Sequence, residues 1–211
     1  LGLNDSRRFI RAARLLAMTS NSAIELLNQL RQLSDGFQYS DGAPLTAASP
    51  KDQALLDLLE RHEGRFIVYA AYTASVDKCV QLAERAGWQV LRCDGRGFHL
   101  SLKGAYRTVE EALLALQRPS DGDDLLCFVG QPGAGGMGLN MQGVSALCYY
   151  SNDFNAESRW QSEARPQRPG NCGLTIYDLI NLPTDLYVVS NLQKKKDLQV
   201  ATVDEIRKAL G

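Results

Sequence analysis

The sequence predicts a doubly wound α/β fold built on a mainly parallel sheet. From residue 65 onward, short apolar runs alternate with amphipathic segments that start at capping residues, and this βαβα order is typical of the class. The apolar runs are continuous rather than alternating with polar residues, as expected for parallel strands covered on both faces. With 211 residues, the chain is long enough for one such domain with additional helices.

Residues 1–48 are predicted to form helices and a linker ahead of this domain. Asp5 can cap a helix that continues to about Met18. The capping box Ser22–Glu25 starts a second helix, in which a stripe of leucines faces inward. Asp41–Ala48 is rich in turn residues and is predicted to be a linker.

The α/β domain is predicted to occupy residues 49–182, with C-terminal helices packing on it over residues 183–211. Ser49 followed by Pro50 marks a helix start, and Gly64 its end. Thr108–Glu111 is a capping box for a further helix. The other predicted elements, in chain order, are strand Phe66–Tyr72, helix Ser75–Ala86, strand Trp88–Cys93, strand Leu125–Val129, strand Ala146–Tyr150, strand Leu174–Ile180 and helix Thr184–Leu198.

The composition limits the classes of function. The formal net charge is −1, so any binding of nucleic acid must come from local patches rather than from bulk attraction. The five cysteines form no CxxC pair and only two histidines accompany them, which predicts free, buried thiols in a reducing compartment and no metal site. No apolar run approaches the ~18 residues of a membrane span and no signal peptide is visible, so we expect a soluble, cytoplasmic protein with no membrane partner. The start at Leu1 suggests a fragment.

Two motifs in the second half of the chain indicate phosphate chemistry. Gly133–Asn140, here called the glycine loop, follows a predicted strand, and its backbone N–H groups could approach an anion without hindrance from Cβ atoms. Gln161–Gly170, here called the arginine segment, carries Arg165 and Arg168, which can converge on one phosphate group through bidentate donors.

A dinucleotide-binding oxidoreductase domain is one interpretation of the glycine loop. The spacing Gly133-x-Gly135-x-x-Gly138 fits the dinucleotide fingerprint, and Asp153 follows at a suitable distance. That fingerprint needs a helix before the next strand, and Leu139–Ser145 is too short for one. The arginine pair would also go unexplained, so NAD(P) binding stays as an alternative.

The two motifs together resemble those of a known family. Ala134–Met141 resembles the AGGxGLNL signature of the second RecA-like lobe of Snf-type helicases and DNA translocases, and the arginine segment resembles the QAxDRxHRxG signature that follows it. Asp94-Gly95-Arg96 and Asp153-Phe154-Asn155 resemble further family motifs, so that the resemblance covers roughly Leu27–Leu198. It implies a P-loop-type, RecA-like helicase C-terminal lobe, which we expect to be of phage or bacterial type.

The resemblance also implies roles for individual residues. The expected catalytic residues are the arginine fingers Arg165 and Arg168, with Gln161 orienting the same phosphate. The expected nucleotide-binding residues are Gly136, Gly138 and Asn140 together with both arginines. The expected DNA-binding residues are Tyr72, Thr73, Arg96, Gln131 and Gly135.

The implied cofactors are ATP and Mg, and the implied partners are an N-terminal RecA-like lobe of the same polypeptide and double-stranded DNA. Neither a GxxxxGK[ST] motif nor a DExH-like block occurs in the chain, so that ATP and Mg should be held mainly by the N-terminal lobe. We therefore expect the chain alone to be inactive. The departures Ala164, Pro166 and Pro169 leave open a second alternative, a non-catalytic interaction domain derived from a helicase lobe.

Overall fold

The computed structural model describes residues 11–12, 22–40, 43–120, 124–134, 139–167 and 173–195. Residues 183–195 are helical, as are residues 11–12. The other elements, in chain order, are α2 (Ala23–Ser34), β1 (Phe37–Ser40), β2 (Ala43–Thr46), α3 (Pro50–Arg61), β3 (Arg65–Tyr69), α4 (Thr73–Arg85), β4 (Gln89–Asp94), β5 (Gly97–Leu100), α5 (Val109–Ala115), β6 (Leu126–Gly130), β7 (Ala146–Tyr149), α6 (Ala156–Ala164) and β8 (Thr175–Asp178).

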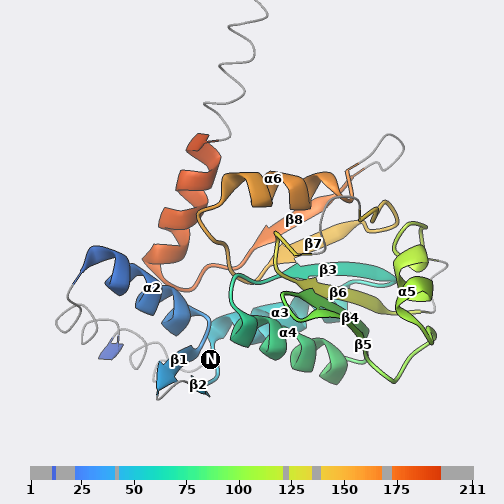
Figure 1. Cartoon of the computed structure of the whole chain (residues 1–211), viewed down its shortest axis with the longest axis horizontal. Coiled ribbons are helices and arrows are strands. Elements are labelled where there is room, and N and C mark those ends of the chain that lie inside the picture. The colour runs from blue at the N-terminus through green and yellow to red at the C-terminus, as the bar shows by residue number, and fades with distance from the viewer. Residues whose placement is uncertain are drawn as a thin grey trace, which may run out of the picture.

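Six of the strands form one sheet in the order β5-β4-β6-β3-β7-β8 (Figure 1). All neighbouring strands are parallel except β5, which runs antiparallel to β4 at one edge. In the middle of the sheet, Ile67 of β3 lies between Phe128 of β6 and Leu147 of β7. The prediction of a doubly wound, mainly parallel α/β fold is confirmed.

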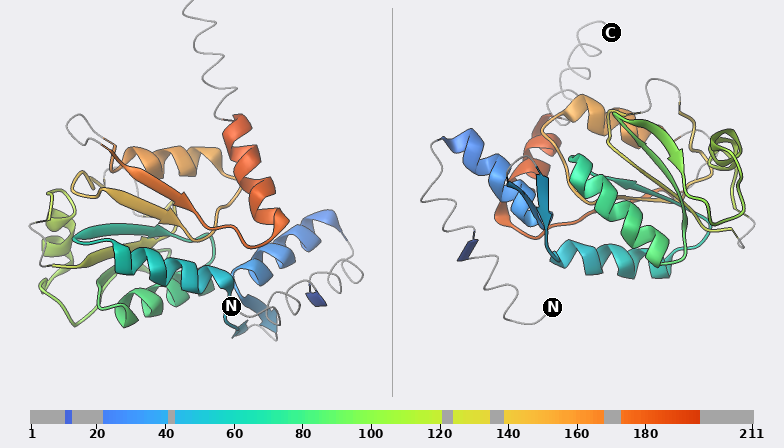
Figure 2. Two further views of the ribbon diagram at one scale, coloured as in Figure 1. Left: turned by 180° about the vertical axis from the view of Figure 1, so that it is seen from behind. Right: turned by 60° about the horizontal axis from the view of Figure 1, so that its bottom comes forward.

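Helices cover both faces of this sheet, which explains the continuous apolar strands. Figure 2 shows α3 and α4 on one side of the sheet and α6 on the other. Leu55 of α3 and Val76 of α4 are buried against the first face together with Val68. Ala112 of α5 is buried against the second face, and Tyr149 on that face contacts Ser162 of α6 through their hydroxyl groups, 2.6 Å apart.

The predicted helix starts are confirmed at three positions. Ser49 and Asp52 form a reciprocal capping box at the start of α3, with proline at the first helical position. Thr108 and Glu111 form the same arrangement at the start of α5. At the start of α2, the Ser22 hydroxyl accepts a hydrogen bond from a backbone N–H of the first turn. Each cap satisfies N–H groups that the helix itself leaves without partners.

The predicted linker Asp41–Ala48 is wrong for the part that the structure describes. β1 and β2 form an antiparallel hairpin in which Phe37 pairs with Thr46. The strand β1 starts after Gly36, which has a φ of +76° and whose carbonyl oxygen accepts a hydrogen bond of 2.7 Å from the Ala47 N–H. Phe37 is buried, so the hairpin is fixed by an apolar anchor that a search for turn residues overlooks.

The strand β5 was also absent from the prediction. It forms a hairpin with β4 across the turn at Gly95 and Arg96, with Asp94 paired to Gly97. A two-residue connection rich in glycine is a hairpin signal, but β5 has only four residues and three of them are exposed. The alternation of apolar and polar residues over Phe98–Leu102 was a second strand signal, and the prediction overlooked it.

A buried lysine joins the flanking helices to the domain. Lys51 Nζ lies 3.0 Å from Asp35 Oδ1 and 3.1 Å from Asp185 Oδ1, and the Lys51 side chain is 1% exposed. Asp35 follows α2 and Asp185 lies in the helix of residues 183–195. The Asp35 carboxylate also accepts a hydrogen bond of 2.6 Å from Ser75 in the first turn of α4. Nothing in the local sequence predicted this contact.

The four cysteines in the described part of the chain are free and buried, as predicted: Cys79, Cys93, Cys127 and Cys148. Burial raises the pKa of each thiol above its ordinary value. Among the described residues, no helix is long and apolar enough to cross a membrane.

Candidate functional site

The loops that follow β3, β4 and β6 meet at the carboxyl edge of the sheet. Gln131, just after β6, donates a hydrogen bond of 3.1 Å from its amide to the Ala71 carbonyl after β3. Its backbone N–H donates to the Cys93 carbonyl of β4 at 3.3 Å. Ligands of open α/β sheets bind beyond this edge. The structure thus brings Gln131 next to the loop that carries Tyr72 and Thr73.

The first turn of α4 points its N–H groups toward this edge. Tyr72 is the N-cap residue, but its side chain makes no capping hydrogen bond, and Thr73 is exposed. An uncapped N-terminus of a long helix favours anions, since its N–H groups and the helix dipole both attract negative charge. Thr73 is therefore well placed for a phosphate contact.

The Tyr72 ring, by contrast, packs toward the N-terminal elements. Arg31 lies over the ring at 5.1 Å from its centroid, and Phe37 meets it edge-on at 5.3 Å. Burial raises the pKa of the Tyr72 hydroxyl to about 12. The side chain of Tyr72 thus links α2 and β1 to the edge of the sheet.

Arg96 lies in the turn after β4, where two carboxylates hold it. Its guanidinium donates to Asp94 at 2.5 Å and to Asp77 of α4 at 2.6 Å, and Arg92 donates to the same Asp94 at 2.6 Å. Two arginines and two aspartates give this cluster no net charge. The Arg96 side chain remains 46% exposed, so the group could still contact a ligand.

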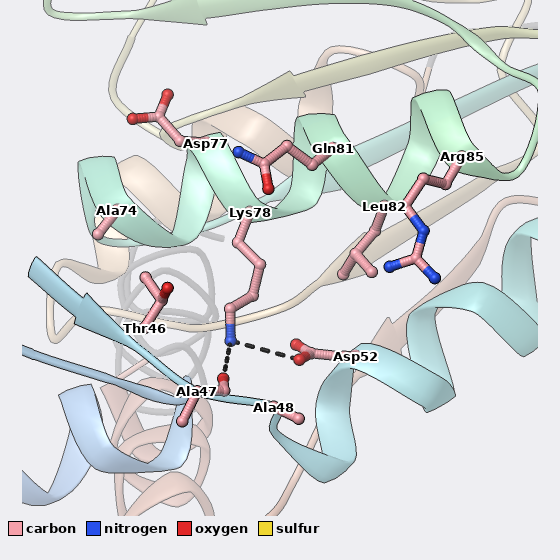
Figure 3. A pocket seen from close by; sticks show the side chains of 10 residues that line it. All are labelled: Thr46, Ala47, Ala48, Asp52, Ala74, Asp77, Lys78, Gln81, Leu82 and Arg85. Carbon is pink, nitrogen blue, oxygen red and sulfur yellow. Dashed lines mark hydrogen bonds and ion pairs between the residues drawn. The ribbon is translucent and has the colours of Figure 1, made fainter.

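A groove of about 480 Å³ lies between β2, the start of α3 and α4 (Figure 3). In Figure 3 Lys78 points into it and donates to the Ala47 carbonyl at 2.8 Å and to Asp52 at 3.3 Å. The same ammonium donates to the Asp35 carbonyl at 2.8 Å. Because these acceptors use all three of its protons, Lys78 fastens the hairpin to α3 and α4 rather than offering a free charge.

The arginine segment begins at the end of α6 and contacts the chain that leaves the glycine loop. The Met141 N–H donates a hydrogen bond of 3.2 Å to the Arg165 carbonyl, so the described residues just after the glycine loop lie beside those at the end of α6. The Arg165 residue is 8% exposed, and its charge acts on Tyr69 and Cys93 at the carboxyl ends of β3 and β4. Burial raises the pKa of Tyr69 to about 12, and Arg165 opposes that rise.

Two other expected site residues lie nearby in different environments. Gln161 is on the exposed face of α6, where its amide donates to Glu157 at 3.0 Å. The Asn140 side chain accepts a hydrogen bond of 3.3 Å from the Gln142 N–H and so shapes the turn after the glycine loop. The remaining expected residues lie outside the described residues: Gly135, Gly136, Gly138 and Arg168.

The structure does not support the dinucleotide alternative. Residues 139–145 contain a turn and no helix. A dinucleotide site of this class places the pyrophosphate at the N-terminus of a helix that directly follows the glycines.

The described part of the chain also contains no group of three His, Cys, Asp or Glu side chains that could hold a metal ion.

Arg159 was not among the expected site residues, although it organises this part of the molecule. It donates to Asp178 at 2.6 Å and to Glu163 at 2.6 Å, and its guanidinium lies 3.5 Å from the Tyr149 ring centroid. Burial alone would lower the pKa of Arg159, but hydrogen bonds to these carboxylates raise it above its ordinary value. The i,i+4 spacing to Glu163 was a visible signal, whereas the contact with Asp178 of β8 was not.

Comparisons with known proteins agree with this architecture. No family model matches the chain. "Helicase SWR1" of Saccharomyces cerevisiae is 25% identical over 201 residues, which cover 92% of this chain and 12% of that protein. "CHD3-type chromatin-remodeling factor PICKLE" of Arabidopsis thaliana is 27% identical over 146 residues, or 69% of this chain and 10% of that protein. The chain thus spans about a tenth of the length of these relatives.

Two solved structures share the fold. The C-terminal part of the Fun30 ATPase domain superposes with a TM-score of 0.52 at 21% identity, covering 68% of this chain and 45% of that one. The C-terminal domain of the DEAD-box protein Dbp5 superposes with a TM-score of 0.50 at 15% identity, covering 69% of this chain and 77% of that one.

The fold is therefore that of a helicase C-terminal RecA-like lobe. In sequence, the chain is similar to SWR1 and PICKLE at 25% and 27% identity. Both relatives named above are eukaryotic, and the expected phage or bacterial type stays a prediction.

Proposed function

We propose that the chain is the C-terminal lobe of an ATP-dependent DNA translocase or helicase. ATP and Mg would be held mainly by an N-terminal lobe of the same polypeptide, and closure of the two lobes would bring the arginine segment onto the nucleotide. The hydrogen bond from Met141 to Arg165 carries this proposal, since it joins both signature motifs near the carboxyl ends of β3 and β4.

Three residues of the arginine segment have a part in this proposal. Arg165, whose charge acts on Tyr69 at the carboxyl end of β3, would be one of the two arginine fingers. Arg168, three residues further on, would neutralise charge that develops on the γ-phosphate, a contribution of roughly 10³–10⁵ in rate for an arginine finger. Gln161 would orient the same phosphate, and Gly136, Gly138 and Asn140 would line the lobe's side of the cleft.

The proposed DNA track runs along the carboxyl edge of the sheet. The uncapped first turn of α4 supports a phosphate contact at Thr73. Gln131 lies beside that loop, and Arg96 belongs to a cluster with no net charge. Backbone N–H groups and neutral side chains would therefore make most of the contacts, which is compatible with the chain's net charge of −1.

The substitution Arg168→Ala in the full-length protein tests this function. DNA-stimulated ATP hydrolysis should fall by roughly 10³-fold or more because the finger charge is lost. Binding of nucleotide, measured by fluorescence titration, should change little, because the N-terminal lobe holds ATP. Arg107→Ala, which removes an exposed arginine elsewhere in the chain, serves as the matched control and should leave hydrolysis unchanged.

Full hydrolysis by the Arg168→Ala protein would remove the finger role. If the unmodified full-length protein hydrolyses no ATP in the presence of DNA, the non-catalytic interaction domain would be the better interpretation. In both cases the fold would stand and only the function would change.

A further inference from the structure

The strand β5 is an open edge of the sheet. In its hairpin with β4, the Ser101 N–H donates to the Val90 carbonyl at 2.8 Å, which makes this a hydrogen-bonded pair. Hydrogen-bonded pairs alternate along antiparallel strands, so His99 directs its main-chain groups toward β4. Phe98 and Leu100 then direct their N–H and C=O groups away from the sheet. Among the described residues, no main-chain hydrogen bond reaches those outward groups.

β5 is short, which is one way to protect an edge strand, but the other usual protections are absent from it. Such strands are commonly blunted by proline, by charged side chains or by a bulge. Gly97–Leu100 contains neither proline nor a charged residue, and its register with β4 has no bulge. The Phe98 side chain is 40% exposed, and Leu102 just after the strand is 93% exposed. An unprotected edge flanked by exposed apolar side chains is typical of a surface that receives an additional strand.

A cavity of about 490 Å³ lies beside this edge, on the face of the sheet that carries α4. His99 and Leu102 line it from the β5 side, and Trp88 and Glu84 line it from the end of α4. Successive side chains of a strand point to opposite faces of the sheet. A strand added beside β5 would therefore direct every second side chain toward this cavity.

The charge of the segment indicates what kind of strand fits. Residues 97–107 include Lys103 and Arg107 and no carboxylate, and both cations are exposed. Lys103 also lines the cavity, where Glu84 of α4 is the one carboxylate, so the two cations of the segment leave a positive balance along this edge. An incoming strand with acidic residues would place opposite charges beside these two, whereas a basic strand would be repelled.

We propose that β5 is a docking edge for an extended acidic segment of a partner protein, which extends the sheet by one strand. The main-chain groups of Phe98 and Leu100 pair with the segment, and alternate side chains enter the cavity. This inference stands on the geometry of β5 alone and does not depend on ATP hydrolysis or on the DNA track.

Amide hydrogen exchange, followed residue by residue by NMR, tests the proposal on the whole chain. The probe is a short peptide of alternating aspartate and valine. On saturation with it, exchange of the Phe98 and Leu100 amides should slow by about tenfold or more, while the His99 amide, already bonded to β4, should change little. The same peptide with lysine in place of aspartate should bind much more weakly.

Two variants locate the binding at this edge. Lys103→Glu should weaken binding of the acidic peptide by about two- to fivefold, the size expected for one exposed charge pair. Lys194→Glu, at an exposed position in the helix of residues 183–195, makes the same change in net charge and should have no effect.

Three results would overturn the proposal. The first is unchanged exchange at Phe98 and Leu100 in the presence of the peptide. The second is equal binding of the lysine peptide, or the same protection by a DNA oligonucleotide. The third is protection that appears without peptide as the protein concentration rises, because the partner would then be a second copy of this chain.

Discussion

At the scale of single residues, Lys51 is a buried side chain that pairs with two carboxylates from distant parts of the chain. Burial alone would lower the pKa of Lys51, but the carboxylates of Asp35 and Asp185 raise it above its ordinary value. The ammonium is therefore charged at neutral pH, and two buried carboxylates depend on it. A buried ion pair adds little net stability, but the removal of one partner leaves an uncompensated charge.

Lys51→Ala should therefore lower the free energy of unfolding by about 3–5 kcal/mol. Urea denaturation followed by circular dichroism gives this value directly. Lys194→Ala, at an exposed position, should stay within ~0.5 kcal/mol of the unmodified chain. If the two variants have equal unfolding free energies, the charge of Lys51 does not compensate the charges of Asp35 and Asp185.

Asp94 gives the molecule a predictable response to acid. Burial disfavours its carboxylate, but hydrogen bonds from Arg96 and Arg92 outweigh this and hold the pKa of Asp94 well below its ordinary value. A lowered pKa means that the stabilisation is complete above the unfolded value of about 3.9 and is lost as pH falls through the folded value.

Asp94→Asn should consequently destabilise the chain by about 1.5–3 kcal/mol at pH 7, the range for hydrogen bonds to charged groups. The difference in unfolding free energy between Asp94→Asn and the unmodified chain should shrink below about pH 4. In that range the unfolded chain takes up a proton on Asp94, so the charged carboxylate stabilises the unmodified protein less. Urea denaturation at pH 7 and pH 3 compares the two. Glu84→Gln removes an exposed carboxylate as the control. A gap of the same size at both pH values would contradict this assignment.

At the scale of elements, the β1–β2 hairpin depends on the conformation of one glycine. Gly36 has a φ of +76°, and a Cβ added there would lie 2.5 Å from the Ala47 carbonyl oxygen. Gly87 has a φ of +88° with open space around it. An alanine at either position would be strained by the left-handed backbone conformation. Only an alanine at position 36 would also overlap with a neighbouring atom.

Gly87→Ala should accordingly cost about 1–2 kcal/mol, the strain of a non-glycine residue in this conformation. Gly36→Ala should cost clearly more, because the hairpin must shift to admit the methyl group. Thermal denaturation of both variants separates the two contributions. If the two melting temperatures fall equally, the close approach of Ala47 is not rigid.

The elements that sequence analysis predicted correctly are those with local signals. The caps at Ser49 and Thr108 are satisfied within one helical turn, so the residues that make them lie three positions apart. The hairpin strand β1 depends instead on Phe37, whose partner Tyr72 is far along the chain. The predicted strand Phe66–Tyr72 was too long for a related reason, since Tyr72 has β-propensity but serves as the N-cap of α4.

At the scale of the whole molecule, the parallel sheet made the position of the candidate site predictable. Carboxyl ends of parallel strands share one edge, and the positions of Tyr72, Arg96 and Gln131 just after apolar runs of the sequence indicate that they lie at that edge. The ionic partners were not predictable in this way, because Lys51 and Asp185 are 134 residues apart. Sequence patterns specify which edge carries the site, whereas packing between distant segments decides which charges remain available there.

This packing makes the helix of residues 183–195 part of the domain's core rather than an appendage. Val188 and Leu192 are buried against Ala156 of α6, and Asp185 supplies one of the two carboxylates of Lys51. A chain that ends at residue 182 should therefore lose at least about 3 kcal/mol of unfolding free energy, the lower bound for breaking a buried ion pair. A chain that ends at residue 195 keeps these contacts and is the matched control. Guanidinium denaturation of both decides the point: if the chain ending at 182 unfolds at the same concentration as the control, the helix contributes nothing to the stability of the sheet.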